Sequence, residues 1–271
     1  MKILFTGNRG NLGKEMIPLL EQDHEVSYYN IDYSNYDVVN SFFRNRSIDF
    51  IIHAAVRGGR RVRADIADDF HNNIVMFENL ASQRIPMINL CSGAAYGRQD
   101  DILKVSERDF GQRIPTDYYG LSKYMITHRC RQLSHVYNLR FFNVFGAQAP
   151  KDMFTTANIT NYINRREIVV FKDKFMDFFG LQDAHKVIDL YLKNSADRYL
   201  PKELNLAYQP TTLLSDVADM INNLSDHKVP VDILEPGTDN AYCGSGWELS
   251  KLNLNLNGLQ KSLEYVYESI R

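Results

Sequence analysis

Short apolar runs alternate along the first half of the chain with longer segments in which apolar residues recur at helical spacing. Residues 2–6 (KILFT) predict a strand, and apolar residues recur at positions 12, 16, 19 and 20 in the segment that follows. Further strands are predicted at 25–30, 49–56, 86–92 and 139–146, with helices at 36–45, 68–83 and 117–137. Such alternation is typical of a parallel sheet covered on both faces. The predicted fold class is therefore α/β, with a doubly wound parallel sheet.

The pattern loosens after residue 150. Helices are predicted at 155–165, 213–224 and 258–270, and strands at 167–171 and 203–208. Residues 177–194 predict a strand followed by a helix. We interpret residues 1–150 as one core, and residues 151–271 as partly an extension of its sheet and partly a small C-terminal lobe.

Composition narrows the class of protein without indicating a reaction. The 271 residues are 44% hydrophobic and 24% charged, which is ordinary for a globular domain. The net charge of −2 favours neither nucleic acid nor an anionic membrane as a partner. Cys91, Cys130 and Cys243 lie too far apart for a CxxC pattern, so neither a disulfide framework nor a metal site is predicted. Because no apolar run in the sequence approaches the ~20 residues that span a bilayer, we expect a soluble, cytoplasmic protein.

Three glycines stand between the first predicted strand and the first predicted helix. Gly7, Gly10 and Gly13 in TGNRGNLG have a G-x-x-G-x-x-G spacing. In such a turn the first glycine allows the tight bend, the second lets the backbone approach a pyrophosphate, and the third permits close helix packing. The N–H groups at the start of the helix, around Asn11 and Leu12, would face the anion. The turn therefore predicts that residues 1–150 form a dinucleotide-binding core and that residues 151–271 include the substrate-binding lobe.

Two residues bear on which dinucleotide is bound. Asp32 lies near the place where an acid would hold the adenosine ribose of NAD, but two residues past the predicted strand, where it could instead contact the adenine. Arg9, inside the glycine turn, either pairs with the 2′-phosphate of NADP or is a solvated surface arginine. NADP is the predicted cofactor, and NAD is the alternative.

A tyrosine and a lysine four residues apart begin the helix predicted at 117–137. Tyr119 and Lys123 lie on one helix face at this spacing. A lysine charge near a phenol stabilises the phenolate and lowers its pKa, as a general acid/base near neutral pH requires. The pair follows a predicted strand that ends at Ser92, which places a hydroxyl, a phenol and an ammonium in one candidate site.

Six segments occur in the order found in one family of enzymes. They are TGNRGNLG (6–13), HAA (53–55), SGAAYG (92–97), YGLSK (119–123), FFNVFG (141–146) and DFFGLQDA (177–184). The chain thus resembles the extended short-chain dehydrogenases/reductases, which include nucleotide-sugar epimerases, dehydratases and 4-keto reductases. The resemblance covers nearly the whole chain and implies a Rossmann-type sheet, a nucleotide-sugar substrate and a homodimer.

The resemblance also implies roles for single residues. Ser92 would hold the reacting oxygen, Tyr119 would transfer the proton, Lys123 would tune Tyr119, and Asn143 would bind the substrate together with Ser92. Tyr96 would have a packing role or a role at the edge of the substrate site. Asn73 resembles the family's buried helix asparagine. The candidate cofactor-binding residues are Gly7, Arg9, Gly10, Asn11, Leu12, Gly13, Asp32, Ala54, Ala55, Tyr119 and Lys123.

Departures from the family pattern indicate the type of reaction. Dehydratases carry an Asp–Glu pair where this chain has Gly93 and Ala94, so elimination lacks its acid and base. The closest pattern is that of GDP-fucose synthases, but the position of their cysteine is Ala94, and residues 143–154 hold no histidine in place of theirs. We therefore predict an NAD(P)-dependent oxidoreductase that reduces the 4-keto group of a nucleotide-linked deoxysugar. The alternatives are a 4-epimerase with tightly bound NAD and a non-catalytic dinucleotide-binding sensor.

Three further sets of residues have more than one interpretation. Met176 stands where the family has an arginine that grips the diphosphate. Cations nearby in sequence that could replace it are Arg165, Arg166, Lys172 and Lys174. Basic residues that could face the ligand or pair with the acids beside them are Arg57, Arg60, Arg61 and Arg63. Tyr242 and Trp247 either line the substrate lobe or serve as ordinary packing.

Overall fold

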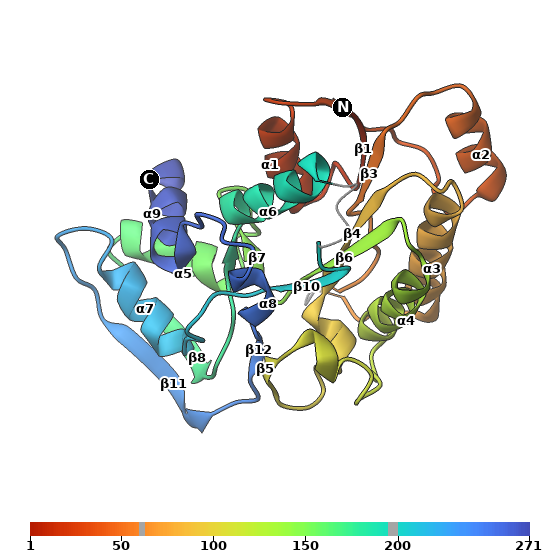
Figure 1. Cartoon of the computed structure of the whole chain (residues 1–271). Helices are drawn as coiled ribbons and strands as arrows, with labels where there is room; N and C mark the ends of the chain where they lie inside the picture. Colours follow the sequence, from red (N-terminus) through yellow and green to blue (C-terminus); the bar gives the residue numbers. More distant parts are fainter. Residues whose placement is uncertain (60–62, 195–199) are drawn as a thin grey trace.

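A six-stranded parallel sheet forms the centre of the computed structural model, which describes residues 1–59, 63–194 and 200–271 (Figure 1). Its strand order is β10-β6-β4-β3-β1-β2. The strands are β1 (Lys2–Thr6), β2 (Glu25–Ser27), β3 (Phe50–His53), β4 (Met87–Ser92), β6 (Val136–Phe141) and β10 (Glu203–Leu206). The chain leaves β1 toward β2 and then returns to the other side of β1 to form β3. The carboxyl ends of β1 and β3 therefore mark the switch point at which such sheets bind ligands.

Helices cover both faces of this sheet. Helices α1 (Asn11–Leu20) and α6 (Leu181–Lys193) pack on one face, where Ile3 and Phe5 of β1 are buried. Helices α2 (Tyr36–Arg44), α3 (Ala67–Ala81) and α4 (Tyr118–Gln132) cover the other face, where Leu4 is buried. Successive residues of a strand point to opposite faces, so the unbroken apolar run of β1 matches its two covered sides. The predicted doubly wound α/β class is confirmed.

Residues from the second half of the chain form a smaller lobe beside the sheet (Figure 1). Its apolar cluster joins α5 (Phe154–Ile163), α7 (Leu214–Asn222) and α9 (Gly258–Ile270) to a parallel pair, β8 (Ile168–Asp173) and β11 (Val231–Thr238). Two short pairs connect this lobe with the core: β7 (Val144–Phe145) with β9 (Phe179–Gly180), and β5 (Ile102–Val105) with β12 (Tyr242–Gly244). The described residues also form helix α8 (Trp247–Ser250) and the 3₁₀ turns η1 (Gly93–Tyr96) and η2 (Glu107–Asp109).

Several element boundaries differ from the prediction. The helix predicted at 117–137 ends at Gln132, because Val136 and Tyr137 are buried as the first residues of β6. The strand predicted at 25–30 stops at Ser27. Helix α1 continues through Pro18, which lies in its last turn and faces solvent. Proline has no N–H to donate, and water can hydrogen-bond the carbonyl oxygen that is left unpaired there. The short strands β5 and β12 were not predicted, because neither has a distinctive apolar pattern.

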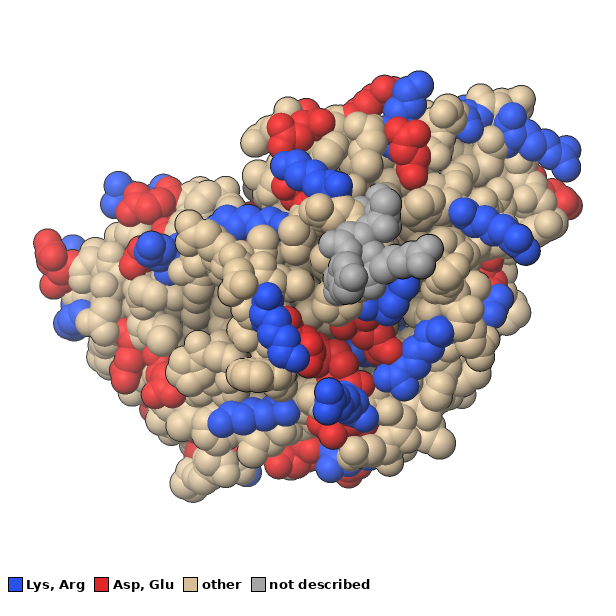
Figure 2. Space-filling model, viewed as in Figure 1, with Lys and Arg blue, Asp and Glu red and all other residues tan. Residues whose placement is uncertain are grey.

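Charged side chains are distributed over both parts of the molecule. Figure 2 shows basic and acidic side chains intermingled on the viewed face. None of the helices in the described ranges is long and apolar enough to cross a membrane.

Candidate active site

A cleft of about 680 Å³ opens between the sheet and the smaller lobe. It lies at the carboxyl ends of β1, β3, β4 and β6, as expected for a doubly wound sheet. Most of the candidate residues from the sequence lie along its wall. These are Gly7, Gly10, Asn11, Leu12, Gly13, Ala54, Ser92, Tyr119, Lys123 and Asn143. The three remaining candidates, Arg9, Asp32 and Ala55, lie outside this set of lining residues.

The glycine turn leaves room for backbone close to the start of α1. Gly7 has a φ of +82°, and a side-chain carbon there would lie 2.7 Å from the backbone of Ala54 and Ala55. A side-chain carbon on Gly13 would lie 2.6 Å from the carbonyl oxygen of Gly7. Among the described residues, no side chain caps the amino end of α1, and its first turn contains no acid. The turn therefore leaves uncapped N–H groups at the positive end of the helix dipole, where an anion can bind.

A guanidinium and an amide pair beyond the end of β2, outside the set of residues that line the cleft. Arg9 Nη2 donates to Asn30 Oδ1 at 2.6 Å. Asp32 instead accepts hydrogen bonds from the hydroxyl of Ser34 at 2.6 Å and from its backbone N–H at 3.0 Å. These hydrogen bonds lower the pKa of Asp32. The Asp32 carboxylate, a candidate from the sequence for binding an adenosine ribose, therefore makes its hydrogen bonds within a local turn.

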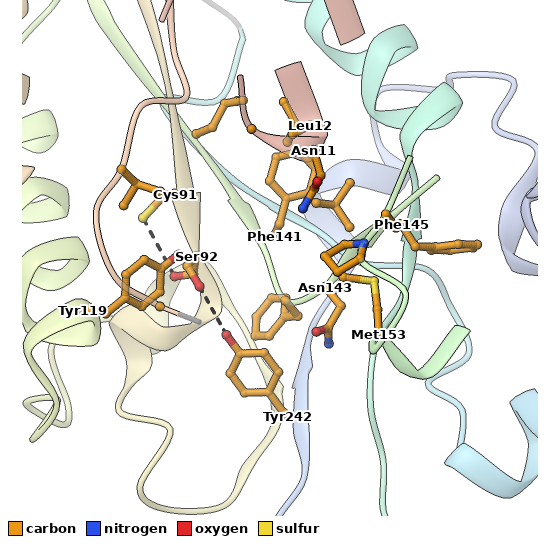
Figure 3. Close-up of a pocket in the computed structure, with 18 of the residues that line it drawn as sticks. Asn11, Leu12, Cys91, Ser92, Tyr119, Phe141, Asn143, Phe145, Met153 and Tyr242 are labelled. Atoms are coloured by element: carbon orange, nitrogen blue, oxygen red, sulfur yellow. Dashed lines mark hydrogen bonds between the residues drawn. The ribbon is translucent and has the colours of Figure 1, made fainter. Parts of the chain in front are cut away.

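Ser92 ends β4 in the middle of the cleft. Its Oγ accepts a hydrogen bond from the backbone N–H of Ala94 at 3.2 Å, which caps the turn η1. The hydroxyl of Tyr242 lies 3.3 Å from Ser92 Oγ. Figure 3 shows Tyr119 and Tyr242 on different sides of Ser92, with their hydroxyl ends directed toward it. Three hydroxyl groups thus gather in this part of the cleft.

Tyr119 and Lys123 approach Ser92 from the first turns of α4. Asp117 caps this helix by accepting from the N–H of Gly120 at 2.8 Å. Lys123 is buried, its Nζ donates to the carbonyl oxygen of Leu90 at 3.1 Å, and it lies 5.8 Å from the centre of the Tyr119 ring. The predicted spacing of four therefore places the ammonium beside the phenol.

A second cation, Arg98, lies against the same ring. Its guanidinium carbon is 5.5 Å from the centre of the Tyr119 ring. Asp117 holds this guanidinium through two hydrogen bonds of 2.8 and 3.2 Å, and Asp65 lies 3.6 Å away. Burial lowers the pKa of Arg98, but the hydrogen bond and charge of Asp117 outweigh it and raise the pKa. The Tyr119 ring therefore has Lys123 and Arg98 as charged neighbours.

The positions at which dehydratases carry an acid and a base are filled by packing. A side-chain carbon on Gly93 would overlap the ring of Phe142, and so would one on Gly244 from the C-terminal segment. Ala94 is fully buried. Phe142 thus fits between two glycines, and no carboxylate fits at position 93 without displacing it.

Another part of the cleft wall consists of Asn143 and the residues around it. Asn143 Nδ2 donates to the backbone carbonyl of Asp177 at 2.9 Å, so its amide is held in place. Met176 is buried and lines the cleft. Of the four cations predicted to replace the missing arginine, Lys174 is the one that lines the cleft, with Nζ 3.8 Å from Asp239 Oδ2.

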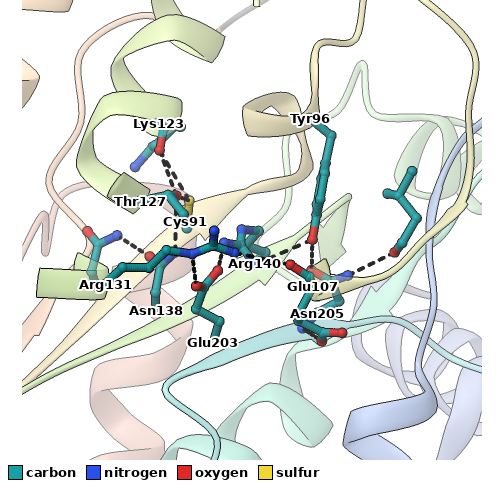
Figure 4. Close-up of polar contacts among 12 residues, drawn as sticks. Cys91, Tyr96, Glu107, Lys123, Thr127, Arg131, Asn138, Arg140, Glu203 and Asn205 are labelled. Carbon is teal, nitrogen blue, oxygen red and sulfur yellow. Dashed lines mark hydrogen bonds and ion pairs between the residues drawn. The ribbon is translucent and has the colours of Figure 1, made fainter. Parts of the chain in front are cut away.

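A polar network links side chains of β6 and β10 (Figure 4). Arg140 of β6 is fully buried and pairs with Glu203 of β10, which also pairs with Arg131. Tyr96 donates to Asn205 at 3.0 Å and stacks on Phe142, which favours the packing role over the role at the substrate edge. The buried Arg140–Glu203 pair was not predicted from the sequence.

The other candidate residues have structural partners. Burial, together with the nearby charge of Lys123, lowers the pKa of His53 to about 3, and its Nδ1 is hydrogen-bonded to Thr6 Oγ1 at 2.9 Å. Buried Asn73 bonds both backbone groups of Arg57, at 2.8 and 2.9 Å. Arg63 pairs with Asp69 at 2.6 Å, whereas Arg60 and Arg61 lie outside the described residues. In the part of the chain that the structure describes, no cluster of three or more His, Cys, Asp or Glu side chains could hold a metal ion.

Comparisons with known proteins agree with this geometry. A sequence model of the NAD dependent epimerase/dehydratase family matches residues 3–207, and the chain belongs to this family. A curated relative, a UDP-glucose 4-epimerase from Halalkalibacterium halodurans, is 25% identical, and the match covers 86% of this chain and 83% of the relative.

Two solved structures show the same fold. One is a GDP-L-fucose synthetase from Naegleria fowleri bound to NADP, with a TM-score of 0.78, 14% identity and coverage of 99% of this chain and 92% of that one. The other is a dTDP-4-dehydrorhamnose reductase from Clostridium acetobutylicum, with a TM-score of 0.79, 19% identity and coverage of 99% of each chain. The resemblance predicted from the sequence is confirmed at the level of the family and of the fold.

Proposed function

We propose that this protein reduces the 4-keto group of a nucleotide-linked sugar and uses NADPH as the reductant. The observation that supports this choice of cofactor is the guanidinium of Arg9, held at 2.6 Å from Asn30 beyond the end of β2. A guanidinium there suits a 2′-phosphate, whereas an NAD site uses a carboxylate for the ribose. The glycine turn, with its uncapped helix end, would hold the pyrophosphate.

Three side chains of the cleft would act on the carbonyl group. A nicotinamide cofactor, when bound, would supply a hydride to the carbonyl carbon. Ser92 would donate a hydrogen bond to the carbonyl oxygen, which gains the electron pair of the C=O bond, and Tyr119 would transfer its proton to that oxygen. The positive charge of Lys123 favours the resulting phenolate, and solvent would then restore the proton.

The packing around Ser92 supports reduction over dehydration and over epimerisation at C3 and C5. Phe142 fills the space at Gly93, so the acid of a dehydratase cannot be accommodated there. Ala94 stands at the position of the cysteine that GDP-fucose synthases use, and no histidine occurs in residues 143–154. Epimerisation at C3 and C5 therefore lacks both of its expected proton carriers.

Lys174 would replace the missing arginine in binding the diphosphate of the substrate. It is the one cation of its predicted group that lines the cleft, on the side where Asn143 and Met176 also lie. A lysine ammonium serves phosphate as a point charge, without the paired hydrogen bonds of a guanidinium. We expect a lysine in place of the family's arginine to preserve binding of the diphosphate, with less directional hydrogen bonds.

Cofactor titration tests the proposal directly. We expect NADPH to bind more tightly than NADH, and Arg9→Gln to weaken NADPH binding roughly 10- to 100-fold, because a charge-assisted bond to phosphate would be lost. NADH binding should be unchanged, and Arg84→Gln, a change on the surface between α3 and β4, provides a control. Equal affinity for the two cofactors, or loss of both in Arg9→Gln, would contradict the role of Arg9.

Turnover tests the reaction itself. The protein should oxidise NADPH when mixed with a 4-keto nucleotide sugar, and Tyr119→Phe should bind NADPH normally but lose turnover. A wild-type protein that consumes no NADPH across a panel of such sugars would refute the reductase proposal.

A 4-epimerase is the second candidate, favoured by the match to a UDP-glucose 4-epimerase over most of both chains. With bound NAD accepting and then returning the hydride, the same three side chains would support oxidation of a 4-hydroxyl and reduction of the ketone from its other face. This function predicts NAD that remains bound through purification, and interconversion of two nucleotide sugars without added cofactor. Mass analysis of the cofactor released by denaturation would distinguish the two functions.

A further inference from the structure

Tyr242 reaches the site from the C-terminal part of the chain. Its backbone N–H donates to the carbonyl of Phe175 at 2.8 Å, and its carbonyl accepts from the N–H of Asp177 at 3.2 Å. Its ring packs edge-to-face on Phe142, with ring centres 5.5 Å apart. These contacts fix the phenol on two sides, and its hydroxyl lies 3.3 Å from Ser92 Oγ (Figure 3).

The number of hydrogen bonds that Ser92 can make determines what its contact with Tyr242 leaves available to a ligand. A serine hydroxyl has one hydrogen to donate and two lone pairs to accept with. The N–H of Ala94 already uses one lone pair of Ser92. If Tyr242 donates to the second lone pair, both are occupied by the protein, and the remaining hydrogen of Ser92 is left for the cleft.

We propose that Tyr242 is a positioning residue, which donates to Ser92 and thereby fixes the Ser92 hydroxyl as a hydrogen-bond donor to the carbonyl oxygen of the substrate. This inference rests on the proposed function for its catalytic consequence, but the Tyr242–Ser92 bond itself does not. Successive hydroxyl donors polarise one another, so the bond would also strengthen the donation from Ser92.

The surroundings of Tyr242 favour its role as the donor. Burial raises the pKa of Tyr242 above its usual value, although the hydrogen bond with Ser92 and the charge of Arg98 act in the opposite direction. The phenol therefore keeps its proton at neutral pH. A carbonyl oxygen in the cleft can only accept, so Ser92 must donate to it and accept from Tyr242.

Kinetics on Tyr242→Phe tests the catalytic consequence, because phenylalanine keeps the packing on Phe142 and removes only the hydroxyl. We expect kcat to fall roughly 3- to 10-fold, the value of one hydrogen bond, with KM and NADPH affinity unchanged. Ser92→Ala should cost more, and the double variant should be no slower than Ser92→Ala. Full turnover in Tyr242→Phe, or multiplied losses in the double variant, would overturn the proposal. Tyr265→Phe, on the exposed side of α9, is the matched control.

A measurement without substrate separates this proposal from the proposed function. In protein labelled with ¹³C at tyrosine Cζ, the signal that disappears in Tyr242→Phe belongs to Tyr242. We expect this signal to shift in Ser92→Ala, while the Tyr96 signal, whose phenol bonds Asn205, stays in place. A Tyr242 signal that does not move would overturn the proposal even in an active reductase. A moving signal in a protein that reduces no keto sugar would refute only the proposed function.

Discussion

Asp177 allows a quantitative prediction of how stability depends on pH. Its side chain is only 4% exposed, and Oδ2 accepts a 2.7 Å hydrogen bond from the N–H of Gly244. Burial raises the pKa of Asp177 from 3.8 to about 7, although this hydrogen bond acts in the opposite direction. The folded protein therefore favours the neutral carboxyl group, whereas in the unfolded chain this group has its usual pKa of 3.8.

The sign and the size of the effect follow from this difference. The stability that the neutral form contributes is fully present below the unfolded pKa and is lost as pH rises through about 7. A shift of about three pH units corresponds to roughly 4 kcal/mol as an upper limit. Asp177→Asn cannot ionise and still offers an oxygen to Gly244. Its advantage in free energy of unfolding over the wild type should therefore grow between pH 4 and 7 and then remain constant.

Urea unfolding followed by circular dichroism at several pH values measures this difference. The buried His53, whose pKa is lowered to about 3, contributes stability that is lost as pH falls from its unfolded pKa toward 3, which gives the opposite slope. The contribution of Asp177 is therefore measured as the difference in free energy of unfolding between the variant and the wild type. Asp152→Asn, at an exposed position, should show no trend. A difference that is independent of pH for Asp177→Asn would refute the reasoning.

Three further predictions concern packing, charge and ligand binding. Gly93→Ala should lower the free energy of unfolding by roughly 1–3 kcal/mol in urea denaturation, because its methyl group overlaps the ring of Phe142; an unchanged midpoint would contradict this packing. Glu203→Gln should cost about 3–5 kcal/mol in the same assay, because it leaves the Arg140 charge buried without its partner; a loss below about 1 kcal/mol would show that the pair is not needed. Lys174→Met should weaken binding of a nucleoside diphosphate in calorimetry roughly 10-fold, the loss of a bond to a charged group, and equal affinity would exclude contact with the diphosphate.

The sequence predicted the parts of the site that depend on local pattern. The glycine turn and the Tyr119–Lys123 spacing each lie within one strand–helix unit, and the structure brings both to the same cleft. Ser92 could be placed because it ends an apolar run that becomes β4. The roles of these residues, the cofactor, the homodimer and the cytoplasmic location stay predictions.

Contacts between distant segments could not be predicted in this way. Tyr242 meets Ser92 across 150 positions through the pairing of β12 with β5, and neither strand has an apolar pattern that reveals it. The two glycines around Phe142 carry no local signal of the ring that fills their space. Arg140 has the sequence context of an ordinary strand residue, and its burial depends on partners that are distant in sequence, Glu203 and Tyr96. Asp32 could be identified as a candidate from the sequence, but its hydrogen-bonded turn with Ser34 could not be predicted.

The late position of Tyr242 in the chain also bears on the order in which the protein is made. The last strand of the central sheet ends at Leu206, whereas Tyr242 lies on β12. A ribosome that has released residues 1–206 has supplied every strand of that sheet and the whole glycine turn, but not the phenol beside Ser92. We therefore expect a nascent or truncated chain to acquire cofactor binding before it acquires the complete set of hydroxyl groups. Such a chain would lack the phenol that we propose to fix the Ser92 hydroxyl, so its turnover should lie below that of the full chain.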